Sequence, residues 1–158
     1  MTRIKQFFNA IFAKITDEDK AYVKKHLNEA GEKLFYGMKV FDQAHSIAVA
    51  RTIETFDYEG DRNFLIRLAL LHDVGRKNIN VFDKVFFVLI SKASIKLTKK
   101  LSNYFTSLYV CLNHAKISAE LLKSAGFDIE AEIVRYHHEG EFNPSVELML
   151  LMRADNLN

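Results

Sequence analysis

The sequence predicts an all-α protein built as a single-domain helical bundle. Apolar residues recur at steps of three and four along most of the chain, which is the spacing of one helix face. The chain has only one proline and six glycines, and no segment alternates apolar and polar residues as a strand would. A turn-rich β fold needs more breaks than that. At 158 residues the chain is long enough for one sizeable hydrophobic core.

The composition restricts the class of protein. Hydrophobic residues make up 49% and charged residues 27%, and the net charge of +2 gives no reason to expect a specific nucleic-acid partner. The single cysteine excludes an internal disulfide bond. The first 14 residues are too charged for a signal peptide, and no apolar run approaches the roughly 20 residues of a membrane span. We therefore expect a cytoplasmic protein.

The first part of the chain predicts short helices that precede the main bundle. Residues 3–14 place apolar side chains at helical spacing between lysines and arginines. Thr16 and Asp19 have the spacing of a capping box, which predicts the start of a second helix. His26 lies beside two lysines in that helix, so we expect it to be solvated. We assign residues 1–40 to an N-terminal helical extension packed on the core.

Two helices follow, and the second ends in a histidine beside an aspartate. Asp42 is predicted to cap a helix that runs to about Phe56. The next helix is apolar on most sides and ends in His72 and Asp73, with Gly75 as its stop signal. A buried, unpaired carboxylate costs several kcal/mol, so a cation must offset it. A metal ion is one candidate, and a nearby Lys or Arg that pairs with Asp73 is the other.

The second half of the chain predicts three more helices. Asn113 can cap a helix that ends before Gly126, and Asp128 can open another that reaches about His138. Asn143 and Pro144 form an N-cap and first-turn pair for the last helix.

The segment 81–101 combines a run of apolar residues with four lysines at its end. We favour a core helix with a solvated basic end. The alternative is an amphipathic basic segment, residues 85–100, that makes peripheral contact with an anionic membrane.

Five of the six histidines share helix faces with apolar residues. A single histidine on such a face is more often satisfied by a backbone carbonyl than bound to a metal. Here several helices each direct a histidine or aspartate inward, which is how helical bundles build metal sites. The set exceeds what one tetrahedral ion uses and suffices for two ions that share a carboxylate. Its members are His45, His72, Asp73, His114, His137, His138 and Asp155.

This ordered set resembles the HD-domain superfamily of metal-dependent phosphohydrolases. The family signature is a His, a His-Asp pair and a distant Asp, matched by His45, His72-Asp73 and Asp155. The run from His72 to Arg76 is similar to the His-Asp-Ile-Gly-Lys subgroup, with Arg in place of Lys. His114 and the pair 137–138 match further histidines of the two-metal branch. The resemblance implies an HD domain over residues 41–158.

The resemblance also implies a function. It implies hydrolysis of a phosphoester or phosphoanhydride, as a phosphodiesterase or phosphatase acting on a nucleotide-type substrate, by water activated by two divalent metal ions. Iron or manganese would be favoured, with cobalt, zinc or nickel as other choices. Asp73 would bridge the ions and Arg76 would contact phosphate. His45, His72 and Asp155 would complete one ion's ligands, and His114, His137 and His138 would serve the other.

Two motifs of the family are absent from the chain, and their absence narrows the range of expected substrates. The Gly-Tyr-Pro run of one cyclic-di-GMP branch is absent after residue 138, and the acidic pair of guanosine-tetraphosphate hydrolases is absent after Asp73. Both named substrates are therefore disfavoured. Two other functions stay open: an HD-fold di-iron oxygenase with a similar ligand set, and a catalytically silent, metal-stabilised binding module.

Overall fold

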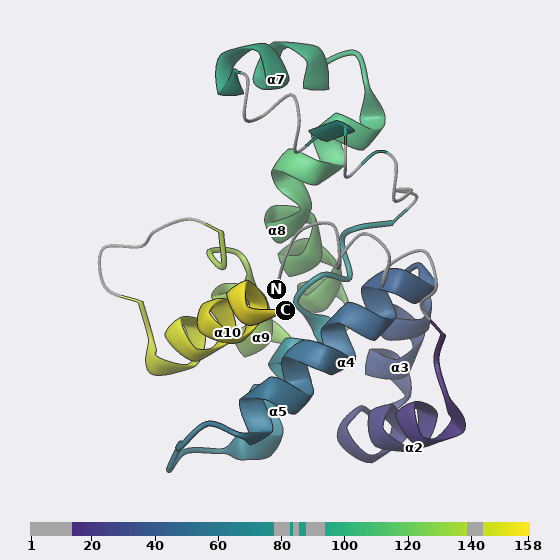
Figure 1. The fold of residues 1–158 in the computed structure, drawn as a ribbon, viewed down its shortest axis with the longest axis vertical. Helices are drawn as coiled ribbons and strands as arrows, with labels where there is room; N and C mark the ends of the chain where they lie inside the picture. The colour runs from purple at the N-terminus through teal and green to yellow at the C-terminus, as the bar shows by residue number, and fades with distance from the viewer. Residues whose placement is uncertain (1–13, 78–82, 84–85, 88–93, 139–143) are drawn as a thin grey trace.

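The computed structural model describes residues 14–77, 83, 86–87, 94–138 and 144–158. Within these ranges the chain is a bundle of α-helices without a strand, as the sequence predicts (Figure 1). None of the helices in these ranges combines the length and apolar character needed to cross a bilayer. Residues 3–13 of the helix predicted over residues 3–14, and the residue Asn143, lie outside the described residues.

Three helices form the centre of the bundle. Helix α4 (Val40–Glu54) packs along α5 (Arg62–Leu71), and α10 (Val146–Leu157) packs against both. Helix α5 is buried on most sides, as its apolar sequence predicts, and six of its ten residues belong to the buried core. The arrangement brings the C-terminal end of α5 against the middle of the bundle.

Two short helices precede α4 in the chain, α2 (Asp17–His26) and α3 (Glu29–Tyr36), and both pack against α5. The predicted capping box is present: Asp19 N donates to Thr16 Oγ1, and Thr16 N donates to an Asp19 carboxylate oxygen. The expectation for His26 is wrong. Both of its ring nitrogens are buried without a hydrogen-bond partner among the described residues, and its ring packs against Tyr22.

The remaining helices form a second layer. The long α8 (Thr106–Ser124) packs against α9 (Asp128–Val134) at one end and α7 (Ile95–Ser102) at the other. Gly126 separates α8 from α9 with a φ of +85°, the left-handed conformation that glycine adopts without strain. The predicted helix stop at Gly126 is therefore confirmed.

Several predicted helix starts are wrong. Asn113 lies inside α8, where its amide donates to Tyr109 O one turn back, and does not begin a helix. Helix α10 is capped by the Ser145 hydroxyl, which accepts from Leu148 N, so the cap does not come from Asn143 and Pro144. The single helix predicted over residues 81–101 is interrupted at Ser94, which is extended and caps a new helix at Ile95. Most of the residues before Ser94 in this segment lie outside the described part of the chain.

Candidate metal centre

The predicted site residues come from five segments that converge at the end of α5. His45 lies on α4, His72 and Asp73 follow α5, His114 lies on α8, His137 and His138 follow α9, and Asp155 lies on α10. The structure brings all seven together as two neighbouring groups. Within each group, one ligand atom of every member lies within 4.8 Å of those of the others. The first group is His45, His72 and Asp155, and the second is Asp73, His114, His137 and His138.

The first group is organised around the carboxylate of Asp155. His45 Nε2 hydrogen-bonds to Asp155 Oδ1 at 2.9 Å, and His72 Nε2 lies 3.7 Å from the same oxygen. His72 is fully buried, whereas His45 and Asp155 are partly exposed. The group thus presents two imidazoles and one carboxylate at the edge of the core.

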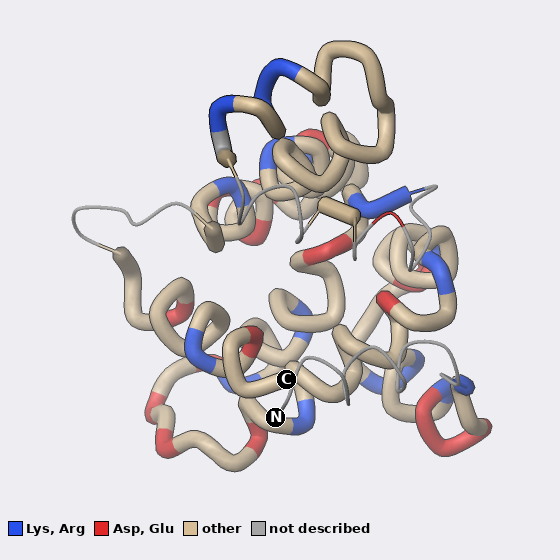
Figure 2. Tube along the Cα trace, turned by 45° about the horizontal axis from the view of Figure 1, so that its top comes forward, with Lys and Arg blue, Asp and Glu red and all other residues tan. Residues whose placement is uncertain are grey.

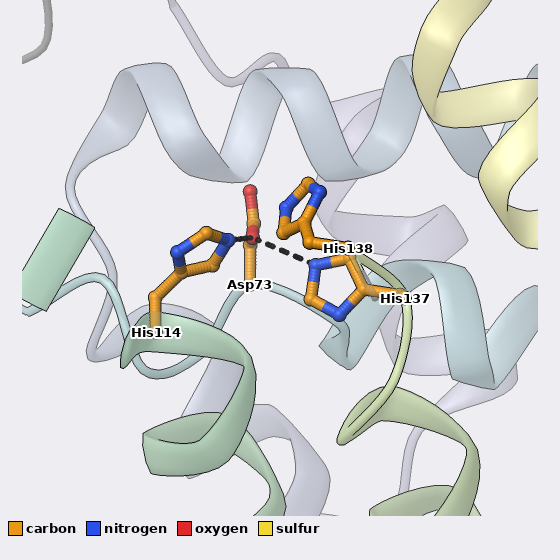
Figure 3. A group of neighbouring side chains, drawn as sticks. All are labelled: Asp73, His114, His137 and His138. Carbon is orange, nitrogen blue, oxygen red and sulfur yellow. Dashed lines mark ion pairs between the residues drawn. The ribbon is translucent and has the colours of Figure 1, made fainter. Parts of the chain in front are cut away.

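The second group surrounds Asp73 with three imidazoles (Figure 3). His114 Nε2 lies 3.5 Å and His137 Nε2 lies 3.8 Å from Asp73 Oδ1. His138 stacks obliquely on His137, with ring centroids 4.1 Å apart, and is the exposed member of the group. The exposed imidazole places the second group next to solvent.

Asp73 links the two groups. Its Oδ1 faces His114 and His137, while its Oδ2 lies 3.5 Å from His72 Nε2 in the first group. The side chain is 0% exposed. One oxygen of a single buried carboxylate is therefore directed to each group of histidines.

Three imidazoles are oriented by the backbone of their own helices. The Nδ1 atoms of His72, His114 and His137 contact the carbonyl oxygens three residues earlier at 2.7, 2.9 and 2.6 Å. A carbonyl oxygen only accepts, so Nδ1 is the protonated nitrogen in each ring. For His72 and His137 these carbonyls lie in the last turns of α5 and α9, where helix carbonyls lack intrahelical partners. Each ring therefore directs Nε2, the nitrogen that can bind a metal, into the site.

The charges of the site favour ionised carboxylates. Burial opposes the ionisation of Asp73, but Arg76 and His72 hold its pKa well below the usual range. Burial also opposes the ionisation of Asp155, but the hydrogen bond from His45 and the interactions with His72 together hold its pKa below the usual range. Burial lowers the pKa of His72, yet the carboxylates of Asp73 and Asp155 raise it to about 9. The space between the two carboxylates therefore attracts positive charge.

The pKa values of His114 and His138 are lowered, in contrast to that of His72. Burial and then the positive charge of Arg76 lower the pKa of His114 well below its usual value. Burial and then His137 lower the pKa of His138 to about 4. Both rings are therefore neutral at pH 7 and keep the lone pair that a metal ion needs.

Arg76 lies among the candidate ligands. Its Nη1 is 2.6 Å from Asp73 Oδ2, and its Nη2 donates to His114 Nε2 at 3.0 Å. Two cations are candidate partners of the buried Asp73, a metal ion and a basic side chain. An arginine does pair with it, and the surrounding side chains are of types that bind metal ions. Asp42 lies on the other side of the guanidinium, 4.0 Å from Nη1, and is fully buried.

Asp42 does not cap a helix as predicted, and it lies close to the site. Helix α4 begins at Val40 with Lys39 as its N-cap, so Asp42 is a buried first-turn residue and not a cap. Its spacing contained a usable signal: Asp42 precedes His45 by three residues and therefore shares its helix face.

Gly75 has a different role from the one predicted. Helix α5 ends at Leu71 with His72 as its C-cap, so Gly75 does not stop the helix. Its N–H donates to Ser118 Oγ on α8 at 2.8 Å. A Cβ at this position would lie 2.5 Å from His114 O and 2.6 Å from Ser118 N. The glycine therefore allows the turn that carries Asp73 to touch the helix that carries His114.

The donor atoms fit a divalent metal ion. His72 Nε2, His137 Nε2 and Asp73 Oδ1 are buried and have no hydrogen-bond partner among the described residues, whereas Asp73 Oδ2 forms the ion pair with Arg76. Buried polar atoms in this condition are costly, and coordination satisfies them. Imidazole and carboxylate ligands together suit transition metals. The residues thus fit a metal centre in which Arg76 must share Asp73 and His114 with an ion.

The fold and the site agree with the comparison to known families. The family model described as HD domain matches residues 43–158. The chain therefore belongs to the HD-domain family, whose superfamily is of the metal-dependent hydrolase type. No curated protein and no solved structure gives a significant match to the chain.

Proposed function

We propose that this HD-domain protein is a phosphohydrolase that cleaves a phosphoester or phosphoanhydride in a nucleotide-type substrate by water activated at two metal ions. The observation that carries the proposal is the position of Asp73, a fully buried carboxylate with one oxygen toward each group of histidines. A carboxylate between two imidazole groups is a ligand arrangement suited to a pair of ions that act on phosphate.

The candidate ligands divide between the two ions. His45, His72 and Asp155 would hold the first ion, and His114, His137 and His138 would hold the second, with Asp73 shared. Iron or manganese suits this set best, and cobalt, zinc or nickel would also bind it. When bound, such a pair supplies a water acidified for attack on phosphorus and neutralises charge on the phosphate oxygens.

The chain itself supplies orientation and charge. Hydrogen bonds from Nδ1 to backbone carbonyls fix the ring planes of His72, His114 and His137, so little reorganisation is needed when a ligand binds. Arg76 supplies a permanent cation at the site, which Asp42 and Asp73 position from two sides. Its planar guanidinium can make two parallel hydrogen bonds to a phosphate group. The exposed His138 lies on the side from which substrate would enter.

The first test combines metal analysis with a phosphate-release screen over nucleotides and cyclic dinucleotides. Asp73→Ala should abolish turnover and metal retention while far-UV circular dichroism stays helical, because the shared ligand is lost. Asp57→Ala is the matched control, since Asp57 is exposed in the loop between α4 and α5. An Asp73→Ala variant with wild-type turnover would end the metal-hydrolase proposal, and oxygen-dependent turnover would favour the oxygenase instead.

The second test counts the ions. Replacing His114 and His138 together by alanine should lower the metal content from two ions per chain to one and stop catalysis. The first group does not include these residues, so the remaining ion is expected to stay bound. A wild-type protein that holds a single ion when fully loaded would contradict the two-metal proposal.

A further inference from the structure

One part of the molecule carries charge and apolar surface that the metal centre does not use. We name it the α7 lobe and define it as residues 94–109, which comprise α7, the turn after it and the start of α8. Helix α7 packs against α8. In Figure 1 the lobe stands at the far end of α8, away from α2, α3 and α5.

The lobe is basic. From residue 84 to residue 119 the sequence contains six lysines and no acidic residue, so the rest of the chain carries a net charge of −4 within a total of +2. Lys96, Lys99 and Lys100 are exposed on the lobe. Figure 2 shows basic positions but no acidic position along α7. Three exposed lysines on one short helix create a local positive potential at this end of the described structure.

The lobe exposes three large apolar side chains and buries two hydroxyl side chains, although Leu108 at the start of α8 is buried. Leu97 is 48%, Phe105 52% and Tyr104 78% exposed, whereas Thr98 is 0% and Ser102 8% exposed. A helix that only covers its own domain turns its apolar side inward. The outward position of these large apolar side chains indicates a second surface that they contact.

The inward hydroxyl groups need no partner from elsewhere in the protein. Thr98 Oγ1 donates to Ser94 O at 2.9 Å, and Ser102 Oγ donates to Lys99 O at 2.8 Å. These bonds lie within α7 and its cap, so the helix can keep this orientation without a polar network in α8.

Exposed apolar residues and lysines lie side by side on the lobe. Within α7, Lys96 precedes Lys100 by four residues and Leu97 precedes it by three, which places both beside Lys100 on the outer surface. Tyr104 follows directly after the helix and is exposed. A helix with apolar residues flanked by lysines is suited to the boundary between lipid headgroups and acyl chains. There the lysine stems lie along apolar surface while their ammonium groups reach the phosphates.

We propose that the α7 lobe docks onto the surface of an anionic lipid bilayer. Leu97, Tyr104 and Phe105 enter the headgroup region, and the lysines contact the negatively charged lipids. Nucleic acid is the less suitable occupant because no arginine occurs between residues 77 and 134. Nucleic-acid surfaces rely strongly on arginine, whose guanidinium makes paired hydrogen bonds to phosphates and bases.

The test is flotation of the full chain with vesicles of phosphatidylcholine alone or mixed with phosphatidylserine. We expect binding to the mixed vesicles at low salt, little binding to phosphatidylcholine alone, and release at high salt. Replacing Lys96, Lys99 and Lys100 by glutamine should weaken binding about 100-fold, at about fivefold per lysine. The matched control replaces three exposed lysines of α2 and α3 and should leave binding nearly unchanged; these are Lys24, Lys25 and Lys33.

A fluorescent reporter tests the orientation directly, because the chain contains no tryptophan. The emission of Tyr104→Trp should shift to shorter wavelength with phosphatidylserine vesicles, while Tyr36→Trp on α3 should not shift. Absence of flotation with anionic vesicles, equal loss in both lysine variants, or an unshifted Tyr104→Trp in the bound protein would each overturn the proposal. Binding of a single-stranded oligonucleotide without binding of vesicles would overturn it as well.

Discussion

Replacing Gly75 by alanine tests the contact that joins the two halves of the metal centre. The added Cβ would lie 2.5 Å from His114 O and 2.6 Å from Ser118 N, both backbone atoms of α8. Neither atom can rotate away, as the end of a side chain could. The turn that carries Asp73 and the helix that carries His114 must therefore separate by about 1 Å to restore ordinary contact distances.

The expected cost has two parts. Overpacking of this kind destabilises a protein by about 1–3 kcal/mol. The hydrogen bond from Gly75 N to Ser118 Oγ is also lost, which adds about 1 kcal/mol. Displacement of Asp73 from His114 by about 1 Å is expected to lower catalysis about 100-fold. Urea unfolding, metal analysis and phosphate-release kinetics measure the three effects.

Gly126→Ala is the matched control. Gly126 has a φ of +85°, but a Cβ there would meet no atom within 4 Å. Alanine in this conformation costs about 1–2 kcal/mol, and the metal content should stay at the wild-type value. Wild-type stability and metal content in Gly75→Ala would refute the reasoning, because they would show that the turn and α8 do not touch.

Two further predictions concern other residues. Arg76→Ala should raise the affinity for the second ion, because the guanidinium no longer competes for His114 Nε2 and Asp73 Oδ2, and should lower kcat/KM about 10- to 100-fold through the lost phosphate contact. Isothermal titration with Mn²⁺ and steady-state kinetics test this, and loss of metal in the variant would contradict it. Burial and then Lys25 lower the pKa of His26 in the folded protein, so its contribution to stability is present above the unfolded pKa of about 6.5 and is lost as the pH falls. Urea unfolding at acidic and neutral pH should show a smaller acid-induced loss for His26→Phe than for the wild type, and equal losses would count against the buried position of His26.

Features of the fold set by local interactions could be predicted from the sequence. The Thr16–Asp19 capping box and the left-handed Gly126 depend on residues within one turn of each other, so their signals are complete in a short window. The convergence of the histidines could also be predicted, because helical periodicity places each one on an apolar face.

Features that depend on distant partners could not be predicted in this way. Asp42 looks like a helix cap in sequence. Its spacing from His45 places it on the same helix face, but its approach to Arg76 depends on how α4 packs against the turn after α5. Gly75 looks like a helix stop, and only the approach of α8 shows why a side chain is excluded. His26 follows two lysines, and the burial of its ring nitrogens depends on the packing of α2 against α5, which a short window of sequence does not encode.

The link between His45 and Asp155 has a consequence for how the protein is made. Their side chains meet at 2.9 Å although 110 positions separate them in the sequence. During synthesis α4 leaves the ribosome long before α10, so a nascent chain holds every other ligand while the first group is still open. Contacts of such long sequence separation form late in folding. An ion held by both residues would close this loop as a cross-link does, and it would stabilise only chains in which α10 has joined α4. Metal binding at the first group would therefore depend on the folding of the whole segment from α4 to α10.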